Sequence, residues 1–311
     1  GGEDGSYNTS TGVSSTPEYG KVFISVKSTT GIDLTVSQKE NLVKGLDSFK
    51  VASITPVVVD PETTFLILGV TFNYNSSATT LGKDTLETNV LTTLTDYSSS
   101  TLNTFNSPFR HSRLTGLVDD TNTAITNNTT TVTMGKFFTP SLNTSTNYSI
   151  NFANAFYNPH SEHNKSGGGI LASTGFPING DTTTEYFFDE DGAGVVRIYS
   201  IVTGTRTYFS SAAGTIDYAN GTVSINAVKI TAVSNVDGAI STQIRVTTIP
   251  SSTDVVPVRN QILEIDLVNS TVTSQVDNTT TTGVGYTTTT SGTASTTSVN
   301  TTTSYPTSSG Y

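Results

Sequence analysis

The sequence predicts an α+β region, then an all-β region, then an extended Thr/Ser-rich tail. Helical stripes of apolar residues occur in the first 136 residues, and no convincing stripe follows them. Only 13% of the residues are charged, and Thr, Ser, Asn and Gly dominate the rest of the polar composition. Because Thr is β-branched and Asn and Gly supply turn geometry, this composition favours strands and turns. We therefore expect a β-rich protein of two or three domains, since one core usually serves about 100 to 200 residues.

The chain opens with residues 1–20, whose Gly, Ser, Thr and Asn content is typical of a linker. Apolar and polar residues then alternate over residues 21–27, which predicts a strand. Thr35 and Gln38 have the spacing of a capping box, and apolar residues follow at helical spacing. A helix from about residue 36 to 49 is therefore expected.

Further elements follow in the same region. Residues 51–59 and 63–73 are apolar and β-branched, and an Asp-Pro pair interrupts them, so they predict two strands joined by a tight turn. An apolar stripe predicts a second helix over about residues 85–97, and a short helix is expected around residues 110–118. Residues 129–134 close the region as a strand.

This order of strands and helices in residues 21–136 predicts a ferredoxin-like βαββαβ domain. Residues 137–277 instead contain short alternating runs separated by turn signals. Favoured hairpin pairs occur at residues 191–192, 220–221 and 237–238. The second region is therefore predicted to be a β-sandwich-like or irregular β domain.

The composition of the C-terminal tail and the first residue of the chain each lead to a separate expectation. Residues 278–311 are almost entirely Thr, Ser and Gly, so they lack the apolar area that would offset the entropy of ordering. We expect surfaces outside this tail, such as those of other chains, to hold it. The chain starts with Gly1 and not with Met, which suggests an internal or C-terminal piece of a longer polypeptide.

Charge and cysteine content exclude several classes of partner. The net charge is −10, from 15 Lys and Arg against 25 Asp and Glu, and no basic cluster is visible. Nucleic acid and anionic membranes are therefore not expected as partners. No run of about 18 apolar residues occurs, so no membrane span is predicted. The absence of Cys excludes disulfides and every zinc site that depends on thiolates.

Three histidines are the candidates for histidine-based chemistry: His111, His160 and His163. The last two flank Glu162, and two His with one Glu could ligate a metal. Their spacing does not match two His four apart on a helix, and neighbouring Pro and Gly residues indicate a loop. We favour a loop whose polar groups bind nearby backbone, and predict no metal ion.

No enzyme motif occurs in the sequence. Residues 189–192 resemble the start of a calcium loop, but position twelve is Ser200 where Glu is required, so a hairpin turn is favoured. Asp119 and Asp120 fit the end of a helix better than an acid and base pair. A phosphate-binding Gly loop and a nucleophile elbow are both missing. We predict no catalytic residue, no cofactor and no enzymatic activity.

Several short stretches resemble the baseplate wedge proteins of T-even-type contractile-tailed bacteriophages. They share their order along the chain with that family and spread over most of it. The same region is more loosely similar to the baseplate J family of other contractile tails. The stretches are residues 1–4, 17–27, 54–61, 109–114, 138–143, 158–161, 214–218 with Gly221, and 257–263.

The resemblance implies a structural virion protein located in the tail baseplate and assembled in the host cytoplasm. Its family members dimerise to build the inner ring of the baseplate. It thus implies a homodimer that contacts other baseplate wedge and tail hub proteins. The Thr-rich tail and the long first linker depart from the family pattern.

Two other classes of function stay open. A carbohydrate-binding or host-adhesion module would use tyrosines of the β-rich region as sugar platforms, although Tyr in strands more often packs across strands. A hydrolase acting on cell wall or polysaccharide would need two carboxylates at a cleft. The tyrosines are Tyr199, Tyr208 and Tyr218, and the carboxylates are Glu162, Glu185 and Glu190.

Overall fold

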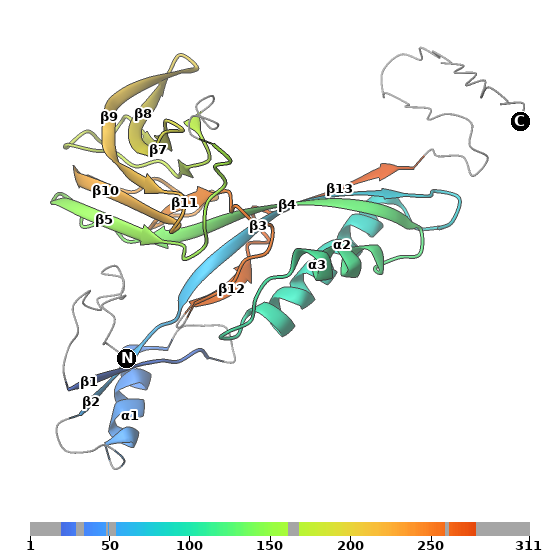
Figure 1. Cartoon of the computed structure of the whole chain (residues 1–311), viewed down its shortest axis with the longest axis horizontal. Helices are drawn as coiled ribbons and strands as arrows, with labels where there is room; N and C mark the ends of the chain where they lie inside the picture. Colours follow the sequence, from blue (N-terminus) through green and yellow to red (C-terminus); the bar gives the residue numbers. More distant parts are fainter. Residues whose placement is uncertain are drawn as a thin grey trace, which may run out of the picture.

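A computed structural model describes residues 20–28, 34–47, 49, 54–160, 168–258 and 261–277. Its strands form sheets of two, five and six strands, so the prediction of a β-rich protein is confirmed. In Figure 1 the six-stranded sheet runs through the middle of the molecule, between a β-rich lobe and a small N-terminal unit. The predicted tail and nearly all of the predicted first linker lie outside the described residues.

The N-terminal unit consists of β1 (Lys21–Ser25), α1 (Val36–Leu46) and β2 (Thr55–Val59). The two strands pair in parallel. Helix α1 begins at the predicted capping box: the Gln38 backbone N–H donates to the Thr35 hydroxyl, and the Thr35 N–H donates to the Gln38 side chain at 2.9 Å. The predicted first helix is confirmed, although it ends three residues earlier than expected.

The six-stranded sheet is built on two long antiparallel strands, β3 (Glu62–Tyr74) and β4 (Ile125–Phe138). Every second residue of β3 from Thr64 onward is buried, because one face of the strand meets the core. On its other edge β3 pairs in parallel with two strands from the far end of the chain. The remaining strands are β12 (Gln261–Ile265) and β13 (Thr271–Val276), both on β3, and β11 (Ile244–Thr248) and β6 (Ala172–Ser173), which follow β4.

The structure does not confirm the ferredoxin-like arrangement. Among the described residues β1 and β2 pair only with each other, and β2 and β3 lie in different sheets where a hairpin was expected. Only Asp60 and Pro61 separate these two strands. Proline lacks an N–H and holds the preceding residue in extended backbone, so this pair continues the chain outward and does not fold it back. Both edges of β3 are occupied by other strands.

Helices cover one face of the six-stranded sheet (Figure 1). These are α2 (Lys83–Tyr97), a π-helix η3 (Ser98–Leu102) and α3 (His111–Asp119). Helix α2 buries Leu86, Val90, Leu94 and Tyr97, which recur at the spacing of one helical face. Both predicted helices are confirmed, whereas the sequence did not predict the π-helix.

The β-rich lobe contains a five-stranded antiparallel sheet. The predicted hairpins at residues 191–192 and 220–221 are confirmed. A third hairpin turns at Thr203 and Gly204, both with positive φ, and was not predicted. In order across the sheet the strands are β5 (Ser145–Asn151), β10 (Thr222–Lys229), β9 (Thr205–Asp217), β8 (Val195–Val202) and β7 (Tyr186–Glu190).

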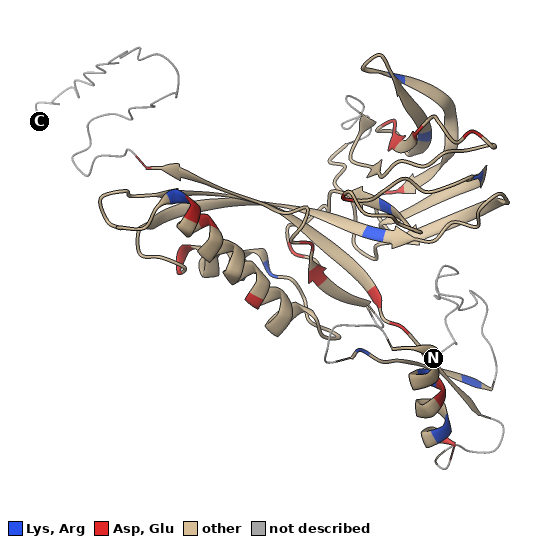
Figure 2. Cartoon of the chain, turned by 180° about the vertical axis from the view of Figure 1, so that it is seen from behind, with Lys and Arg blue, Asp and Glu red and all other residues tan. Residues whose placement is uncertain are grey.

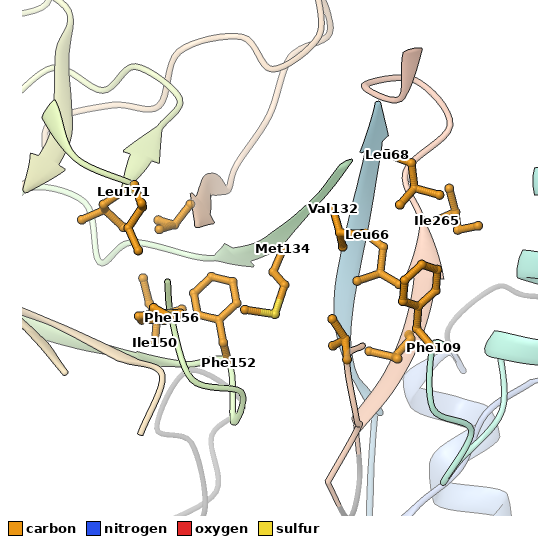
Figure 3. Close-up of a cluster of buried hydrophobic side chains, with 14 of the residues drawn as sticks. Leu66, Leu68, Phe109, Val132, Met134, Ile150, Phe152, Phe156, Leu171 and Ile265 are labelled. Carbon is orange, nitrogen blue, oxygen red and sulfur yellow. The ribbon is translucent and has the colours of Figure 1, made fainter. Parts of the chain in front are cut away.

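One hydrophobic core connects the six-stranded sheet with the β-rich lobe. Figure 3 shows Leu66 and Phe109 on the side of β3, Met134 on β4, and Phe152 and Leu171 on the side of the lobe. Strand β4 continues past residue 137, where the sequence placed a domain boundary. That boundary stays a prediction, and strands from beyond residue 260 join the sheet that begins before it.

Candidate functional site

The N-terminal unit exposes much of its apolar surface. Of its described residues only Pro56 is buried, and α1 buries none. Val36 on α1 is 71% exposed, Leu42 on the same helix is 41% exposed, and Phe49 beyond its end is 84% exposed. A contact between Lys39 Nζ and Asp60 Oδ2 at 2.5 Å ties α1 to the end of β2. The unit therefore presents apolar side chains of an amphipathic helix, together with a small sheet, to its surroundings.

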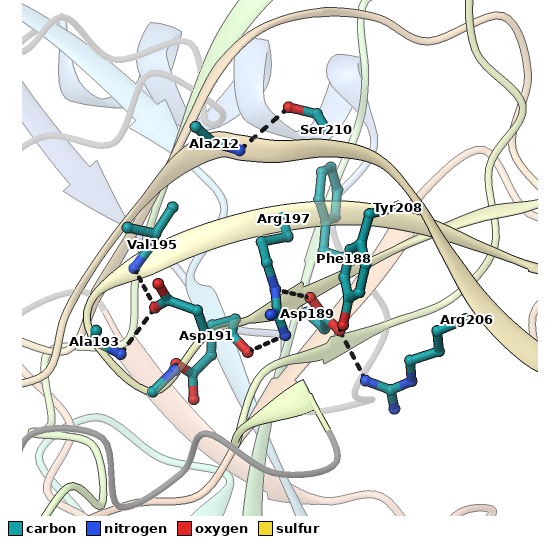
Figure 4. A network of polar contacts seen from close by, with 12 residues as sticks. Phe188, Asp189, Asp191, Ala193, Val195, Arg197, Arg206, Tyr208, Ser210 and Ala212 are labelled. Carbon is teal, nitrogen blue, oxygen red and sulfur yellow. Dashed lines mark hydrogen bonds and ion pairs between the residues drawn. The ribbon is translucent and has the colours of Figure 1, made fainter.

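A cluster of charged and hydroxyl side chains lies in the β-rich lobe, around the buried Asp189 of β7 (Figure 4). Arg197 Nε donates to its Oδ1 at 2.9 Å, and Arg206 Nη1 and the Tyr208 hydroxyl donate to its Oδ2 at 2.8 and 3.0 Å. Each guanidinium also lies over a tyrosine ring, Arg197 over Tyr208 and Arg206 over Tyr199. The charge of Asp189 is thus balanced by partners from β8, the neighbouring strand, and from β9, the strand beyond it.

The adjacent Glu190 is also buried, and it faces the other way. Its Oε1 accepts the Ile170 N–H at 2.9 Å, and its Oε2 accepts the Tyr218 hydroxyl at 2.6 Å and the Gly192 N–H. Gly169 has a φ of +71°, and a Cβ there would overlap the Glu190 carboxylate. Only glycine allows the backbone so close. We call Asp189, Glu190, Arg197 and Arg206 the carboxylate clamp.

The carboxylate clamp has the chemistry of a structural junction. Burial, together with the hydrogen bond to Glu190, raises the pKa of the Tyr218 hydroxyl above its ordinary value. Burial also raises the pKa of Tyr199. Both hydroxyls therefore stay protonated at neutral pH, and both carboxylates already accept two or more hydrogen bonds. Neither carboxylate is placed to act as a general base or nucleophile, because donors from the chain itself occupy it.

Other candidate residues from the sequence are dispersed. His111 Nε2 donates to the Thr130 carbonyl at 2.8 Å, and Asp119 accepts from Asn128. His160 is exposed, while Glu162 and His163 lie outside the described residues. In the described part of the chain no three His, Asp or Glu side chains come together in a way that could hold a metal ion.

The remaining candidates lie in the β-rich lobe. Glu185 borders an open groove next to Thr184, Ile201 and Val202, away from the clamp. Tyr208 and Tyr218 use their hydroxyls on Asp189 and Glu190, and an arginine covers one ring face of Tyr199. These tyrosines bond to or pack against their own chain, although Tyr208 is still 42% exposed. Within the described helices none is long and apolar enough to cross a membrane.

Sequence reasoning did not find the arginines of the clamp. Asp189 and Arg197 are directly opposite each other across the hairpin at residues 191–192. Pairing outward from that turn could have predicted their contact. Arg206 and Gly169 carry no such local signal, because they reach the carboxylates from a further strand and from a loop.

Comparisons with known proteins match two segments within the first 136 residues to phage baseplate proteins. Residues 9–59 match the family described as baseplate structural protein gp6, C-terminal domain I, and residues 62–136 match C-terminal domain III of the same protein. The chain resembles the C-terminal part of a phage baseplate wedge protein. The resemblance stated from the sequence is therefore confirmed. The two matches meet at Asp60 and Pro61, where the N-terminal unit gives way to β3.

A similar protein supports the same resemblance. The baseplate wedge protein gp6 of Enterobacteria phage T4 is 26% identical over 115 residues. That match covers 37% of this chain and 17% of the T4 protein. Both family matches end before β5, so the β-rich lobe with its carboxylate clamp lies outside them.

Proposed function

We propose that the chain is part of a baseplate wedge subunit that dimerises and joins neighbouring wedges in a contractile phage tail. The family matches support a structural role in the baseplate. In this proposal the protein is not an enzyme. It is assembled in the host cytoplasm and becomes part of the virion, where it contacts other wedge proteins and tail hub proteins.

We propose the N-terminal unit as the surface through which two copies dimerise. Parallel sheets are normally buried on both faces, and a two-stranded sheet is rarely stable alone. Here β1 and β2 form such a sheet, one helix accompanies it, and the described residues bury almost no side chain. A second protein surface on this unit would cover Val36 and Leu42 and give the strand edges a partner. In a closed dimer the covering surface is the same unit of the other copy.

The rest of the described chain supports the joining role. One core runs from the helices through β3 and β4 into the β-rich lobe, and the carboxylate clamp ties β7, β8 and β9 to the loop at residues 168–170. A continuous core transmits displacement because packed interiors deform little. Movement of β3 or of the helices packed on it would thus reach the β-rich lobe.

The proposal is tested by measuring the mass of the chain in solution. We expect twice the 32.7 kDa of one chain, and we expect Leu42→Ser to return the single-chain mass. The matched control is Leu142→Ser, since Leu142 is 50% exposed but lies in the β-rich lobe. A wild-type chain that is monomeric at every concentration overturns dimerisation. An unchanged mass in Leu42→Ser overturns the assignment of the surface.

The location is tested on purified particles. Cross-linking of intact tails followed by mass spectrometry should join lysines of the N-terminal unit, such as Lys21 and Lys44, to a second copy or to other baseplate proteins. If the protein is absent from purified virions, the baseplate assignment is wrong.

A further inference from the structure

One edge of the six-stranded sheet is protected against pairing with other chains mainly by the helical segment beside it. Strands β12 and β13 form this edge, one after the other along β3. Exposed edges normally carry charges or proline that prevent a further strand from adding. Strand β13 has neither in its sequence TVTSQV, whereas β12 carries Glu264. Figure 2 shows few charges along the long strands β3 and β4 of the same sheet.

Ser274 shows how the β13 edge is closed. In a parallel pair alternate residues direct their backbone groups to opposite sides. The Asp277 N–H donates to Tyr74 on β3, so the Ser274 N–H, an odd number of residues away, points outward. It donates to Glu87 Oε1 of α2 at 2.8 Å, and the Ser274 hydroxyl donates to the same oxygen at 2.9 Å. The carboxylate thus occupies the place where a carbonyl of an added strand would sit.

The β12 edge is closed in the same way. The Asp266 N–H donates to Leu66 on β3, so the N–H of Ile265 points outward. It donates to the hydroxyl of Ser98, the first residue of the π-helix, at 2.9 Å. Both Ile265 and Ser98 are buried. Two outward N–H groups on successive strands therefore bind side chains from one continuous helical segment, α2 with η3.

We propose that the side chains of Glu87 and Ser98 block this edge and prevent it from pairing with the same edge of a second copy of the chain. The partner that would pair with this edge is a second copy of the chain. Two identical edges paired antiparallel satisfy the same outward N–H and C=O groups on both chains. The uncharged β13 sequence offers no repulsion against its own copy. This edge is separate from the N-terminal unit, so the inference does not depend on the proposed dimer.

The proposal is tested by removing both hydrogen-bond acceptors, the Glu87 carboxylate and the Ser98 hydroxyl. The double variant with Glu87→Ala and Ser98→Ala should have at least twice the mass of the wild-type protein by analytical ultracentrifugation. The mass is twice that of a monomeric wild type and can be larger for a dimeric one, because each dimer then has two open edges. Asp84→Ala is the matched control, because Asp84 is an exposed acid of the same helix, and it should keep the wild-type mass. Glu87→Gln should also keep that mass, because the amide oxygen still accepts from Ser274.

A cysteine trap locates the new contact, since the chain has no native Cys. Thr273→Cys on β13 should form an intermolecular disulfide in the double variant and not in the otherwise wild-type chain. Circular dichroism separates loss of folding from self-association, and Glu87→Gln supplies the folded comparison if the double variant unfolds. A folded double variant with the wild-type mass overturns the proposal, as does a Glu87→Gln chain that self-associates like the double variant.

Discussion

The N-terminal unit and the body of the molecule differ in what stabilises their helices. Helix α1 has a complete capping box but buries no residue. Helix α2 has Gly82 at its start with no side-chain cap, yet it buries four side chains against the sheet. A local cap thus fixes where α1 begins, while burial supplies most of the stability of α2. The comparison supports the proposal that a second protein surface covers the N-terminal unit.

The largest expected difference comes from the same substitution made in each region. Leu66→Ala in the core should lower the free energy of unfolding by about 3–5 kcal/mol, because Leu66 is fully buried and leaves a cavity. Leu42→Ala on α1 should change it by less than about 0.5 kcal/mol in the monomeric chain. Urea unfolding measures both. Equal losses at the two sites would contradict the comparison.

A smaller effect is expected where β4 enters the lobe. Lys136 is buried, donates to the Asn151 carbonyl at 2.5 Å and pairs with Glu62. Lys136→Met should cost about 1–3 kcal/mol, because it leaves those two acceptors without their donor. Lys229→Met on an exposed site of β10 is the control and should be close to neutral. A neutral Lys136→Met in the same urea experiment would show that the ion pair adds no net stability.

A pH-dependent effect is expected at the start of α3. Hydrogen bonds from the Arg110 side chain and the His111 N–H hold the pKa of Asp254 below its ordinary value. A carboxylate with a lowered pKa stabilises the fold above its unfolded pKa and loses this effect as the pH falls through its folded pKa. Asp254→Ala should therefore cost about 0.5–1 kcal/mol at neutral pH and nothing in strong acid.

Thermal unfolding at several pH values measures the effect of Asp254→Ala. Asp120→Ala, an exposed acid just beyond the end of α3, is the control and should show no such dependence. A constant difference between the wild type and Asp254→Ala at all pH values would argue against a charged contact.

The smallest effect is expected in α1. Thr35→Ala removes one half of the capping box and should weaken this helix by about 0.5–1 kcal/mol. Because α1 is not packed into the core, the loss should appear as reduced helical circular dichroism without a shift in the main unfolding transition. Ser37→Ala, on the exposed face of α1, is the control. A shift of the main transition in Thr35→Ala would mean that the two regions unfold together.

Local features of the fold could be predicted from the sequence, and remote pairings could not. The capping box at Thr35 and the hairpin at residues 220–221 are set by neighbouring residues, and both were found. Strand β13 was missed because its TVTSQV sequence lacks a clear apolar alternation. Its pairing with β3 depends on an edge created about 200 residues earlier, which no local pattern encodes.

The candidate functional surfaces also divide into local features that the sequence predicts and remote contacts that it does not. The exposed apolar residues of α1 looked like an ordinary amphipathic helix, and only the structure shows that nothing in the described chain covers them. In the lobe, residues 189–192 were correctly expected to include a hairpin turn, since Asp191 binds the backbone of Ala193 and Val195. That Asp189 gathers two arginines could not be foreseen, because Arg206 reaches it only through the curl of β9.

The pairing of β3 with β12 and β13 has a consequence for synthesis on the ribosome. Strand β3 ends at Tyr74, and its last partner ends at Val276. At about 5–20 residues per second, roughly 10–40 s separate their emergence from the exit tunnel. During that interval the apolar β3 has an open edge, so a nascent chain stalled before residue 261 carries an unpaired template for aggregation. Chaperone binding to the growing polypeptide should therefore be strongest in this window and end when β13 emerges.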